Sequence, residues 1–408
     1  MADTGTGAKG ARAAQGALSH WDLIVVGVGA VGSAALRAAS ESGANVLGIE
    51  LHTPAHTRGS SHGLSRIFRH AYFEHPDYVP LLRHSTARFE SLERESGTQL
   101  LHRCGMLVMG ACGSETVSGS LGSARRWGLP VDELDATELR SRFPWFVVPD
   151  DAIGAYEANA GIVRPEATVN AAVAVARTRG TELRVGLRVR SIVEDATGVT
   201  VETDDGPERA AAVIVTAGAW ASQLMPELAS LLTVTRQVQA WFAPTAGTDA
   251  SAMPCWLFDR APGRRAIYGL APDPLAASDA GGAPSPGRYP KVGLHGSDVV
   301  VDPDTGAHAV GDSDIASIRE AFGERAPALT GDLVEAATCL YTMSPDENFL
   351  VGTRRDCTRT HFAAGLSGHG FKLAPALGDA LVDLALRGHT DLPVGFLAPN
   401  RFGTRGSP

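Results

Sequence analysis

The stretch DLIVVGVGAVGSAALRAASESGANVLGIE, residues 22–50, decides the fold of this 408-residue chain. A buried-strand run, DLIVV, leads directly into Gly27, Gly29 and Gly32, which have the spacing GxGxxG and open a predicted helix. The run NVLGI predicts a second strand, and Glu50 stands at its end. The pattern is that of a βαβ unit of the dinucleotide-binding kind.

Each part of this unit has a physical reason to hold a dinucleotide. The first glycine permits a tight turn, the second lets the backbone approach a pyrophosphate, and the third allows close packing of helix on strand. The first helical residues, Ala30 and Val31, then face the phosphates. Glu50 can accept a hydrogen bond from a ribose 2′-hydroxyl, which favours FAD or NAD over NADP. The alternative is a glycine turn that serves only close packing in an α/β core.

Two later segments favour a long cofactor. AAVIVTAGAW (211–220) predicts a strand that runs into a turn at Gly218, and THFAAGLSGHGFKLAPALGDALVDLAL (360–386) predicts a strand, a glycine-rich turn and a helix. Backbone NH groups in such turns can surround a flat or anionic ligand. Residues near 27, 218 and 370 would all contribute to one nucleotide site. This indicates FAD rather than NAD, because an NAD-binding domain is normally formed by one contiguous segment of the chain.

Composition excludes several classes of protein. The net charge of -9 gives no reason to expect nucleic acid or an anionic membrane as partner, and no stretch reaches the roughly 18–20 apolar residues of a membrane span. Five cysteines without a CxxC pair argue against a disulfide framework or a metal site and fit a reducing compartment. Residues 1–19 lack the apolar core of a secretory signal and are predicted to be disordered. We therefore expect a cytoplasmic protein.

The order of predicted elements gives an α/β fold with two domains. We predict a Rossmann-like FAD-binding domain from residues 20–98, 160–232 and 335–398, and a second, mixed-sheet substrate domain from residues 99–159 and 233–334. QVQAWFAP and RAIYGLAP alternate as strands do, whereas APDPLAASDAGGAPSPGRYP is predicted to be a loop.

Basic residues are distributed unusually. Of 36 basic residues only three are lysines, and the two outside the N-terminal tail are Lys291, in KVGLH, and Lys372, in GLSGHGFKLAP. The segment GSSHGLSRIFRHAY gathers further charged and aromatic side chains directly after the nucleotide unit, namely His62, Arg66, Arg69, His70 and Tyr72. Taken alone it could be a solvated basic loop.

Several motifs in order closely resemble the monomeric sarcosine oxidase / N-methyltryptophan oxidase family of flavoenzymes. They are PAHTRGSSHGLSRIFRHAYFEHPDYVPL, TAGAW, KVGLH, CLYTMSPDENF and GLSGHGFKLAP, and the resemblance runs from Asp22 to about Arg401. It implies FAD, held covalently by a thioether to Cys339, and a substrate carboxylate bound between Arg69 and Lys372. It also implies that Lys291 activates oxygen above the flavin.

The resemblance assigns further residues to the site. It places Arg66 and His62 beside the flavin ring, Tyr268 and His295 in the substrate pocket, and Tyr341 close to the covalent cysteine. The positions that it places at the cofactor are Gly27, Gly29, Ala30, Val31, Gly32, Glu50, Ser65, Arg66, Val189, Gly218, Cys339, Gly368, His369, Gly370, Phe371 and Lys372. A narrow site above a flat ring favours the thin lysine stem over the broad arginine fork, which explains the two body lysines.

The implied reaction is oxidation of a secondary, N-methyl amino acid to an imine, with oxygen as the acceptor and hydrogen peroxide as a product, in a monomeric enzyme. The family often reads SHHGDTR where this chain reads SSHGLSR, so that Leu64 replaces an acid and Ser65 a threonine. This change touches the site entrance and leaves the substrate open. The alternatives are an oxidase of a cyclic amino acid such as pipecolate, a tailoring enzyme of secondary metabolism, or a flavin- or nucleotide-binding protein without catalysis.

Overall fold

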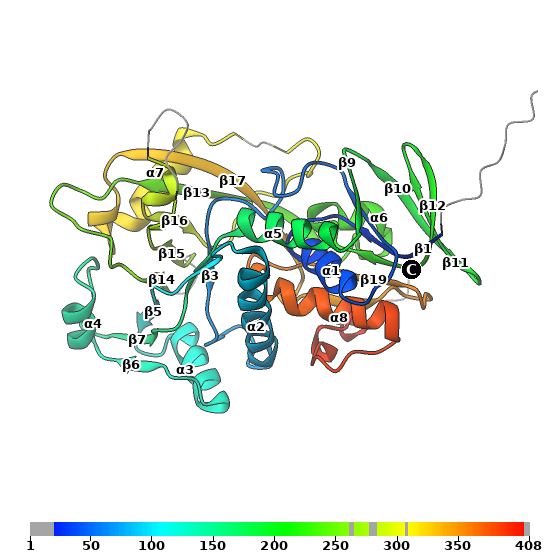
Figure 1. Ribbon diagram of the computed structural model, residues 1–408. Coiled ribbons are helices and arrows are strands. Elements are labelled where there is room, and N and C mark those ends of the chain that lie inside the picture. Colours follow the sequence, from blue (N-terminus) through cyan, green and yellow to red (C-terminus); the bar gives the residue numbers. More distant parts are fainter. Residues whose placement is uncertain (1–19, 261–264, 277–283, 307–308, 404–408) are drawn as a thin grey trace, which may run out of the picture.

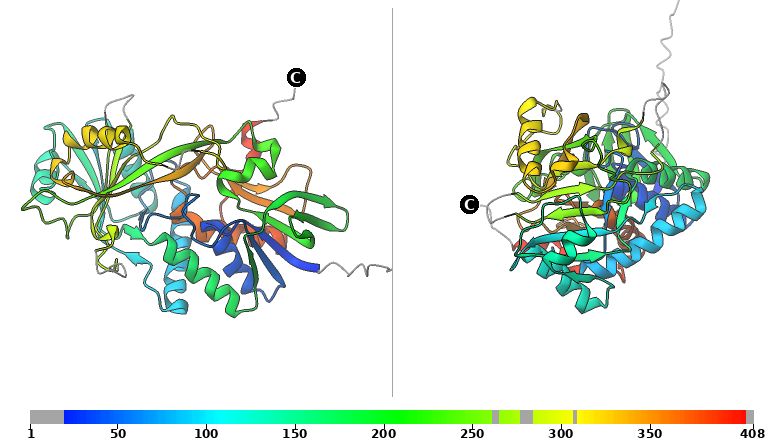
Figure 2. Two further views of the ribbon diagram at one scale, coloured as in Figure 1. Left: turned by 90° about the horizontal axis from the view of Figure 1, so that it is seen from above. Right: turned by 90° about the vertical axis from the view of Figure 1, so that its left-hand side faces the viewer.

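The computed structural model describes residues 20–260, 265–276, 284–306 and 309–403. The predicted disordered tail, residues 1–19, lies outside these ranges. The described chain forms two domains, each built on an eight-stranded sheet. Figure 1 shows the sheets side by side, and in the left view of Figure 2 they lie at opposite ends of the long axis of the molecule. The predicted two-domain α/β fold is confirmed.

The first sheet carries the βαβ unit. Its strands are β1 (His20–Val26), β2 (Val46–Glu50), β9 (Glu182–Val185), β10 (Val189–Asp195), β11 (Gly198–Thr203), β12 (Gly206–Val215), β18 (Leu350–Thr353) and β19 (Thr360–Ala364). Strands β9, β2, β1, β12 and β19 are neighbours in that order and all pair in parallel. β12 has two partners along one edge, because its first half pairs with β11 and its end pairs with β19.

Helices flank this sheet and extend into the second domain. They are α1 (Ala30–Ser40), α2 (Tyr78–Ser96), α3 (Glu115–Trp127), α4 (Ala136–Arg142), α5 (Pro165–Thr178), α6 (Ala221–Leu224), α7 (Asp312–Gly323) and α8 (Ala374–Arg387). α1 packs against α5 and α8, and α2 packs against the same two helices. In the described residues, no helix is both long and apolar enough to cross a membrane.

The second sheet is mixed, as predicted. Its strands, in spatial order, are β17 (Leu333–Met343), β13 (Thr233–Phe242), β16 (Lys291–Leu294), β15 (Ile267–Leu270), β14 (Cys255–Phe258), β5 (Met106–Ala111), β7 (Ala152–Glu157) and β6 (Asp132–Leu134). β14 and β5 pair in parallel, and the other neighbours are antiparallel. A small third sheet is formed by β3 (Arg66–Phe68), β8 (Gly161–Val163) and β4 (Leu101–His102).

One predicted boundary differs from the observed sheets. The chain was expected to return to the FAD-binding domain at residue 335, but this position lies inside β17 of the second sheet. β17 pairs with β13 along almost its whole length, so the ladder holds the chain in the second sheet until Met343. The middle of the predicted loop after β15 lies outside the described residues.

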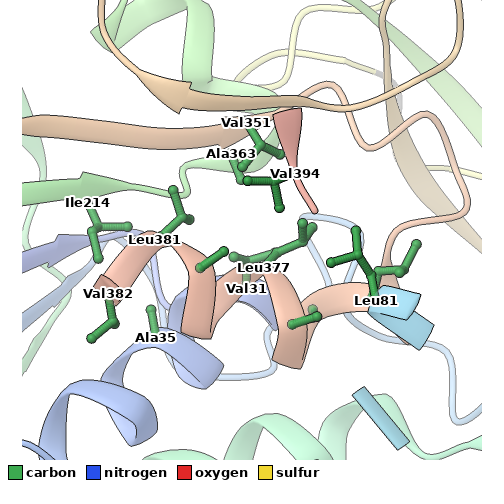
Figure 3. Close-up of a cluster of buried hydrophobic side chains, with 14 of the residues drawn as sticks. Val31, Ala35, Leu81, Ile214, Val351, Ala363, Leu377, Leu381, Val382 and Val394 are labelled. Atoms are coloured by element: carbon green, nitrogen blue, oxygen red, sulfur yellow. The ribbon is translucent and has the colours of Figure 1, made fainter. Parts of the chain in front are cut away.

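The core of the first domain lies where α1 meets α8. Figure 3 shows Leu377, Leu381 and Val382 of α8 packed among apolar side chains from the sheet and from α1. The approach is close at Gly378, since a Cβ there would lie 2.8 Å from the backbone nitrogen of Ala35. The small side chains of both helices therefore set their separation.

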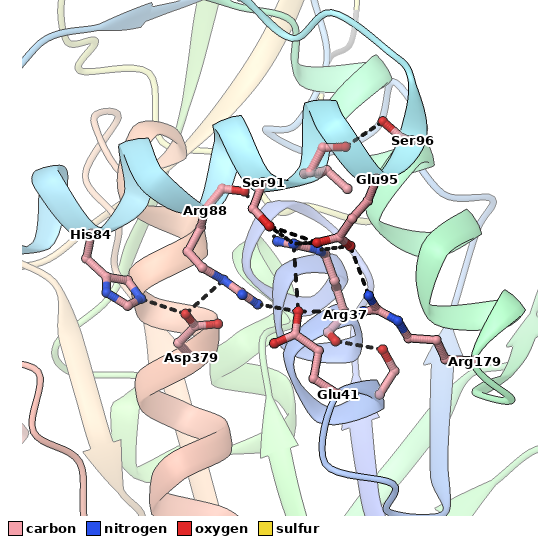
Figure 4. A network of polar contacts seen from close by, with 11 residues as sticks. Arg37, Glu41, His84, Arg88, Ser91, Glu95, Ser96, Arg179 and Asp379 are labelled. Carbon is pink, nitrogen blue, oxygen red and sulfur yellow. Dashed lines mark hydrogen bonds and ion pairs between the residues drawn. The ribbon is translucent and has the colours of Figure 1, made fainter.

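A polar network ties α1 and α8 to α2 (Figure 4). Arg37 of α1 is only 3% exposed, and its Nε donates to Glu95 of α2 at 3.2 Å. Arg88 of α2 contacts Glu41 at 2.9 Å and Asp379 of α8 at 3.0 Å. These ion pairs fix the orientation of α1, whose N-terminus lies at the cavity described next.

Candidate active site

One large cavity brings most of the predicted site residues together. Its wall is formed by the glycine turn after β1, the glycine-rich turn after β19 and strands of the second sheet. The predicted residues that line it are Gly27, Gly29, Ala30, Val31, Glu50, Ser65, Arg66, Arg69, Val189, Gly218, Tyr268, Lys291, His295, Cys339, Tyr341, Gly368, His369, Gly370, Phe371 and Lys372. Gly32 and His62 do not line it.

The first turn of α1 forms one end of the cavity and fits a pyrophosphate. Gly27 has a φ of +87°, where a Cβ would lie 2.7 Å from the Thr216 carbonyl oxygen. A Cβ on Gly32 would lie 1.9 Å from the Gly27 carbonyl oxygen, so Gly32 serves the packing of the turn and is turned away from the cavity. At Gly29, by contrast, the Ser61 hydroxyl at 3.3 Å is the one described atom within 4 Å of such a Cβ. The missing side chain at Gly29 therefore leaves room for a ligand.

Glu50 is buried at the end of β2. Its two oxygens accept hydrogen bonds from the backbone NH groups of Val28, at 2.7 Å, and His52, at 2.9 Å. The bond from Val28 holds the glycine turn against the end of β2. Each carboxylate oxygen can accept a second hydrogen bond, so a ribose hydroxyl remains a possible partner for Glu50.

The glycine-rich turn between β19 and α8 approaches the cavity from another side. Gly368 has a φ of +80°, and a Cβ there would lie 2.2 Å from the ring of Tyr341. A Cβ on Gly370 would meet the Leu366 side chain at 2.6 Å. The bare backbone of the turn thus packs directly on the strand that carries Cys339.

Cys339 lies in the middle of β17 and faces the cavity. It is 7% exposed, and Tyr341, two residues further along the strand, lies on the same face. Burial raises the pKa of the Cys339 thiol, whereas the charges of Arg66 and Lys291 oppose this shift. A thiol beside the Arg66 guanidinium can lose its proton to a reaction partner more easily than an isolated buried thiol.

Lys291 begins β16 and is fully buried, with 2% exposure. Its Nζ donates to the carbonyl oxygen of Gly63 at 2.9 Å and to that of Ser65, and it lies 5.7 Å from the centre of the Trp241 ring. Burial, and then the charge of Arg66, lower the pKa of Lys291. The two carbonyl groups hold the amine in place at the cavity wall.

His62 lies behind the cavity wall and does not reach the cavity. It is 3% exposed, and its Nε2 has no hydrogen-bond partner among the described residues. Burial, and then the charges of Arg66 and Lys291, lower its pKa to about 3. The imidazole is therefore neutral at physiological pH.

Arg69 already holds a carboxylate. It is 4% exposed, its Nη2 donates to both oxygens of Glu74 at 2.6 and 2.7 Å, and its Nη1 donates to the Ala71 carbonyl oxygen. Its guanidinium lies 4.3 Å from the ring centre of Tyr72 and 4.5 Å from that of Phe73. Burial would raise the pKa of Glu74, but the charges of Arg69, His369 and Lys372 hold it at about 2.

Lys372 lies next to the pair formed by Arg69 and Glu74, although it comes from the opposite end of the chain. Its Nζ donates to the His369 carbonyl oxygen at 2.8 Å and to the Tyr72 hydroxyl at 3.4 Å. Burial, and then the charge of Arg69, lower the pKa of Lys372 to about 7. The fold therefore brings Arg69 and Lys372 together around an acidic group.

Aromatic and apolar side chains enclose the space between the cation pair and Cys339. The rings of Tyr268 and His295 lie 6.5 Å apart, and those of His295 and Tyr341 lie 5.9 Å apart. Burial lowers the pKa of His295 and raises that of Tyr268, so both are neutral at pH 7. Sequence reasoning missed several lining residues, namely Phe73, Glu74, Met106, Gln239, Leu257 and Leu270.

His70, in the segment GSSHGLSRIFRHAY, has a structural role. The His70 ring contacts the Glu157 carboxylate at 2.8 Å through Nδ1 and the Thr86 hydroxyl at 2.8 Å through Nε2. Glu157 also accepts hydrogen bonds from the backbone NH groups of His70 and Ala71. This network fixes the backbone directly after Arg69.

Comparison with known proteins gives the family. Residues 22–384 match the family model described as FAD dependent oxidoreductase. The chain is 38% identical to the monomeric sarcosine oxidase of Streptomyces avermitilis, over 93% of this chain and 97% of the relative. It is 34% identical to the N-methyl-L-tryptophan oxidase of Salmonella dublin, over 90% of this chain and 95% of that protein.

Among solved structures, the open form of NikD, described as an unusual amino acid oxidase essential for nikkomycin biosynthesis, superposes with a TM-score of 0.79. The match has 26% sequence identity and covers 93% of this chain and 97% of NikD. The bare glycines at the N-terminus of α1, which line the cavity, agree with these relatives. The chain belongs to the family of FAD-dependent oxidoreductases.

Proposed function

We propose that the protein is an FAD-dependent oxidase of a secondary, N-methyl amino acid. The observation that carries this proposal is the pair Arg69 and Lys372, which meets around the Glu74 carboxylate in the same cavity as Cys339 and Lys291. A buried site that holds a carboxylate between two cations suits an amino-acid substrate. The sarcosine and N-methyltryptophan oxidases among the relatives act on such amino acids by name.

The chain's own residues would bind and orient this substrate. The substrate carboxylate takes the place of Glu74 on Arg69 and approaches Lys372, which fixes the neighbouring carbon in one position. Tyr268, His295 and Tyr341 exclude water around the amine, and their neutral state adds no charge there. When bound, FAD would accept the hydride equivalent from that carbon and pass the electrons to oxygen, giving hydrogen peroxide.

We also propose roles for two residues toward the cofactor and oxygen. Cys339 would hold the flavin through a thioether, because its thiol faces the cavity under the influence of Arg66 and Lys291. Lys291 would promote the reaction with oxygen, because its amine is held rigidly at the cavity wall. Since one chain supplies the lining residues of the cavity, we expect the monomer to be active.

A panel of amines tests the proposal. Peroxide formation is measured with sarcosine, N-methyltryptophan, pipecolate and proline, and with an N-methylamine that lacks the carboxylate. We expect N-methyl amino acids to give peroxide and formaldehyde, and the amine without a carboxylate to react poorly. Equal rates with and without the carboxylate would contradict the assignment of Arg69 and Lys372.

A second candidate is an amino-acid oxidase of secondary metabolism. The superposition with NikD favours it, and so does the substitution of an apolar residue, Leu64, near the site entrance. Leu64 lies close to the loop after β15, since a Cβ on Gly287 would be 3.5 Å from its side chain. Peroxide formation from a cyclic substrate without formaldehyde would select this candidate.

A further inference from the structure

Two cysteines far apart in sequence meet beside the candidate active site. Cys104 lies in the turn before β5, and Cys255 is the first residue of β14, which pairs in parallel with β5. The backbone NH of Cys255 donates to the Gly105 carbonyl oxygen at 3.0 Å. The two sulfur atoms lie 4.0 Å apart, and both thiols are free.

The thiol pair lies directly behind the apolar wall of the cavity. Side chains alternate along β14, so Cys255 and Leu257 share one face, while Trp256 packs in the opposite core. Cys255 belongs to the same apolar cluster as Met106 and Leu270. Leu257, Met106 and Leu270 all line the cavity, so the apolar cluster that contains Cys255 forms part of the cavity wall.

The two thiols differ in environment. Cys255 is fully buried, whereas Cys104 is partly exposed. The hydrogen bond from Cys255 lowers the pKa of Cys104, and burial raises the pKa of Cys255. Because the thiolate is the nucleophile, Cys104 is the thiol suited to attack an oxidant, and Cys255 is placed to resolve the product.

We propose that Cys104 and Cys255 form a dithiol site that hydrogen peroxide oxidises to a disulfide. The Cys104 thiolate attacks one peroxide oxygen, an S–O bond forms, the O–O bond breaks, and the hydroxide released takes a proton to become water. The Cys255 sulfur then attacks the Cys104 sulfur, an S–S bond forms, and the second oxygen leaves as water. Two thiols and one peroxide thus give one disulfide and two waters.

The geometry permits this step. The sulfur atoms must approach from 4.0 Å to about 2.05 Å, and rotation of the Cys104 and Cys255 side chains would supply this change. The disulfide would tie the turn before β5 to the start of β14, behind Met106 and Leu257. The supply of peroxide from within the cavity rests on the proposed oxidase function, whereas the dithiol chemistry does not.

The experiment therefore has two arms, both with the complete flavin-loaded enzyme. In the first arm, hydrogen peroxide is added without substrate. In the second arm, the enzyme turns over sarcosine in air, while peroxide is assayed separately. We expect the thiol count in denaturant to fall by two in both arms. We also expect a peptide pair linked through Cys104 and Cys255, lighter by two hydrogen atoms and restored by dithiothreitol.

Matched variants locate the effect. Cys112→Ser removes an exposed cysteine and should leave the linked peptide unchanged, whereas Cys104→Ser and Cys255→Ser should each abolish it. Flavin absorbance and melting temperature confirm that each variant is folded. The proposal is overturned if added peroxide leaves both thiols free or oxidises Cys104 without forming the link. A link with added peroxide but no peroxide during turnover would keep the dithiol site and contradict the proposed function.

Discussion

At the scale of single residues, the acid on Arg69 is the most informative feature of the site. Glu74 makes two charge-assisted hydrogen bonds to the guanidinium, so the free site is already neutralised. A substrate carboxylate gains only the difference between its own contacts and those of Glu74. The motif around Arg69 contains Glu74. The contact between the two side chains depends on how the chain folds back over five residues, and the spacing in the sequence does not reveal this.

The charge of Lys372 should make carboxylate binding depend on pH near neutrality. Its pKa is about 7, lowered first by burial and then by Arg69. The protonated, attractive form prevails below this pKa and is lost above it. We expect the dissociation constant of a simple carboxylate such as propionate to rise above pH 7 by at most about tenfold per pH unit. Flavin absorbance measures the binding. Lys372→Met should bind weakly at every pH, and a break near pH 7 that persists in this variant would contradict the assignment.

The proposed thioether at Cys339 predicts a visible difference after denaturation. Acid-precipitated wild-type protein should keep its yellow colour in the pellet, because a covalent bond survives unfolding. Cys339→Ala should release FAD to the supernatant, and Cys112→Ala, at an exposed cysteine, should behave as wild type. A colourless wild-type pellet would show that the flavin is not attached covalently.

Replacement of Lys291 should affect only one half of the catalytic cycle. Transfer of an electron to oxygen creates a negative charge, and a fixed cationic or hydrogen-bonding amine in a dry site stabilises it. Loss of one such group costs roughly 10²–10³ in rate. Stopped-flow measurement of Lys291→Met should therefore show slower reoxidation by oxygen and nearly unchanged anaerobic reduction by substrate. Reoxidation at the wild-type rate would leave Lys291 with a structural role alone.

At the scale of elements, the sequence predicts the pieces of the site better than their boundaries. The βαβ unit ends close to where the strand and glycine patterns place it, because local periodicity and turn residues determine such ends. The start of the last segment of the FAD-binding domain was misplaced, since β17 is held in the second sheet by its pairing with β13. Such long-range pairing leaves no local signal. The contact between Cys104 and Cys255 cannot be predicted from the sequence for the same reason.

The contact between α1 and α8 gives a prediction for helix packing. Gly378→Ala places a Cβ 2.8 Å from the Ala35 backbone nitrogen, so overpacking should cost about 1–3 kcal/mol of stability. The matched control is Gly122→Ala in α3, where no described atom lies within 4 Å of the new Cβ. That exposed change should stabilise the protein by about 0.5–1 kcal/mol. Chemical unfolding of both variants measures the difference, and destabilisation of similar size in both would refute the packing argument.

At the scale of the whole molecule, the cavity depends on how the two domains are joined. Arg164, directly before α5, donates through Nε to Asp273 at 2.6 Å, and Asp273 lies in the segment after β15. Both residues are buried, and the NH of Asp273 also donates to the Gly287 carbonyl oxygen at 2.7 Å. This pair fixes the base of the loop after β15, whose course the sequence could not predict from its proline-, glycine- and alanine-rich composition.

Breaking this pair should therefore destabilise the protein strongly. Asp273→Ala leaves the buried Arg164 without its carboxylate, and loss of one partner in such a pair typically costs about 3–5 kcal/mol. Glu133→Ala is the control, because its partner Arg125 has a side chain that is 70% exposed, and such surface pairs contribute about 0–1 kcal/mol. Thermal or urea unfolding compares the two. Equal effects would mean that the Arg164 pair contributes little to the junction.

The cavity wall also has a consequence for biosynthesis. Its lining residues run from Val26 to Lys372, so the first contacts for FAD leave the ribosome long before the last. At about 5–20 residues per second, the interval is roughly 20–70 seconds. During this time the nascent N-terminal unit has its glycine turn but neither Cys339 nor the second glycine-rich turn. FAD is then bound only when the chain is nearly complete. The abundance of FAD in the cell can therefore limit how many new chains reach the mature state.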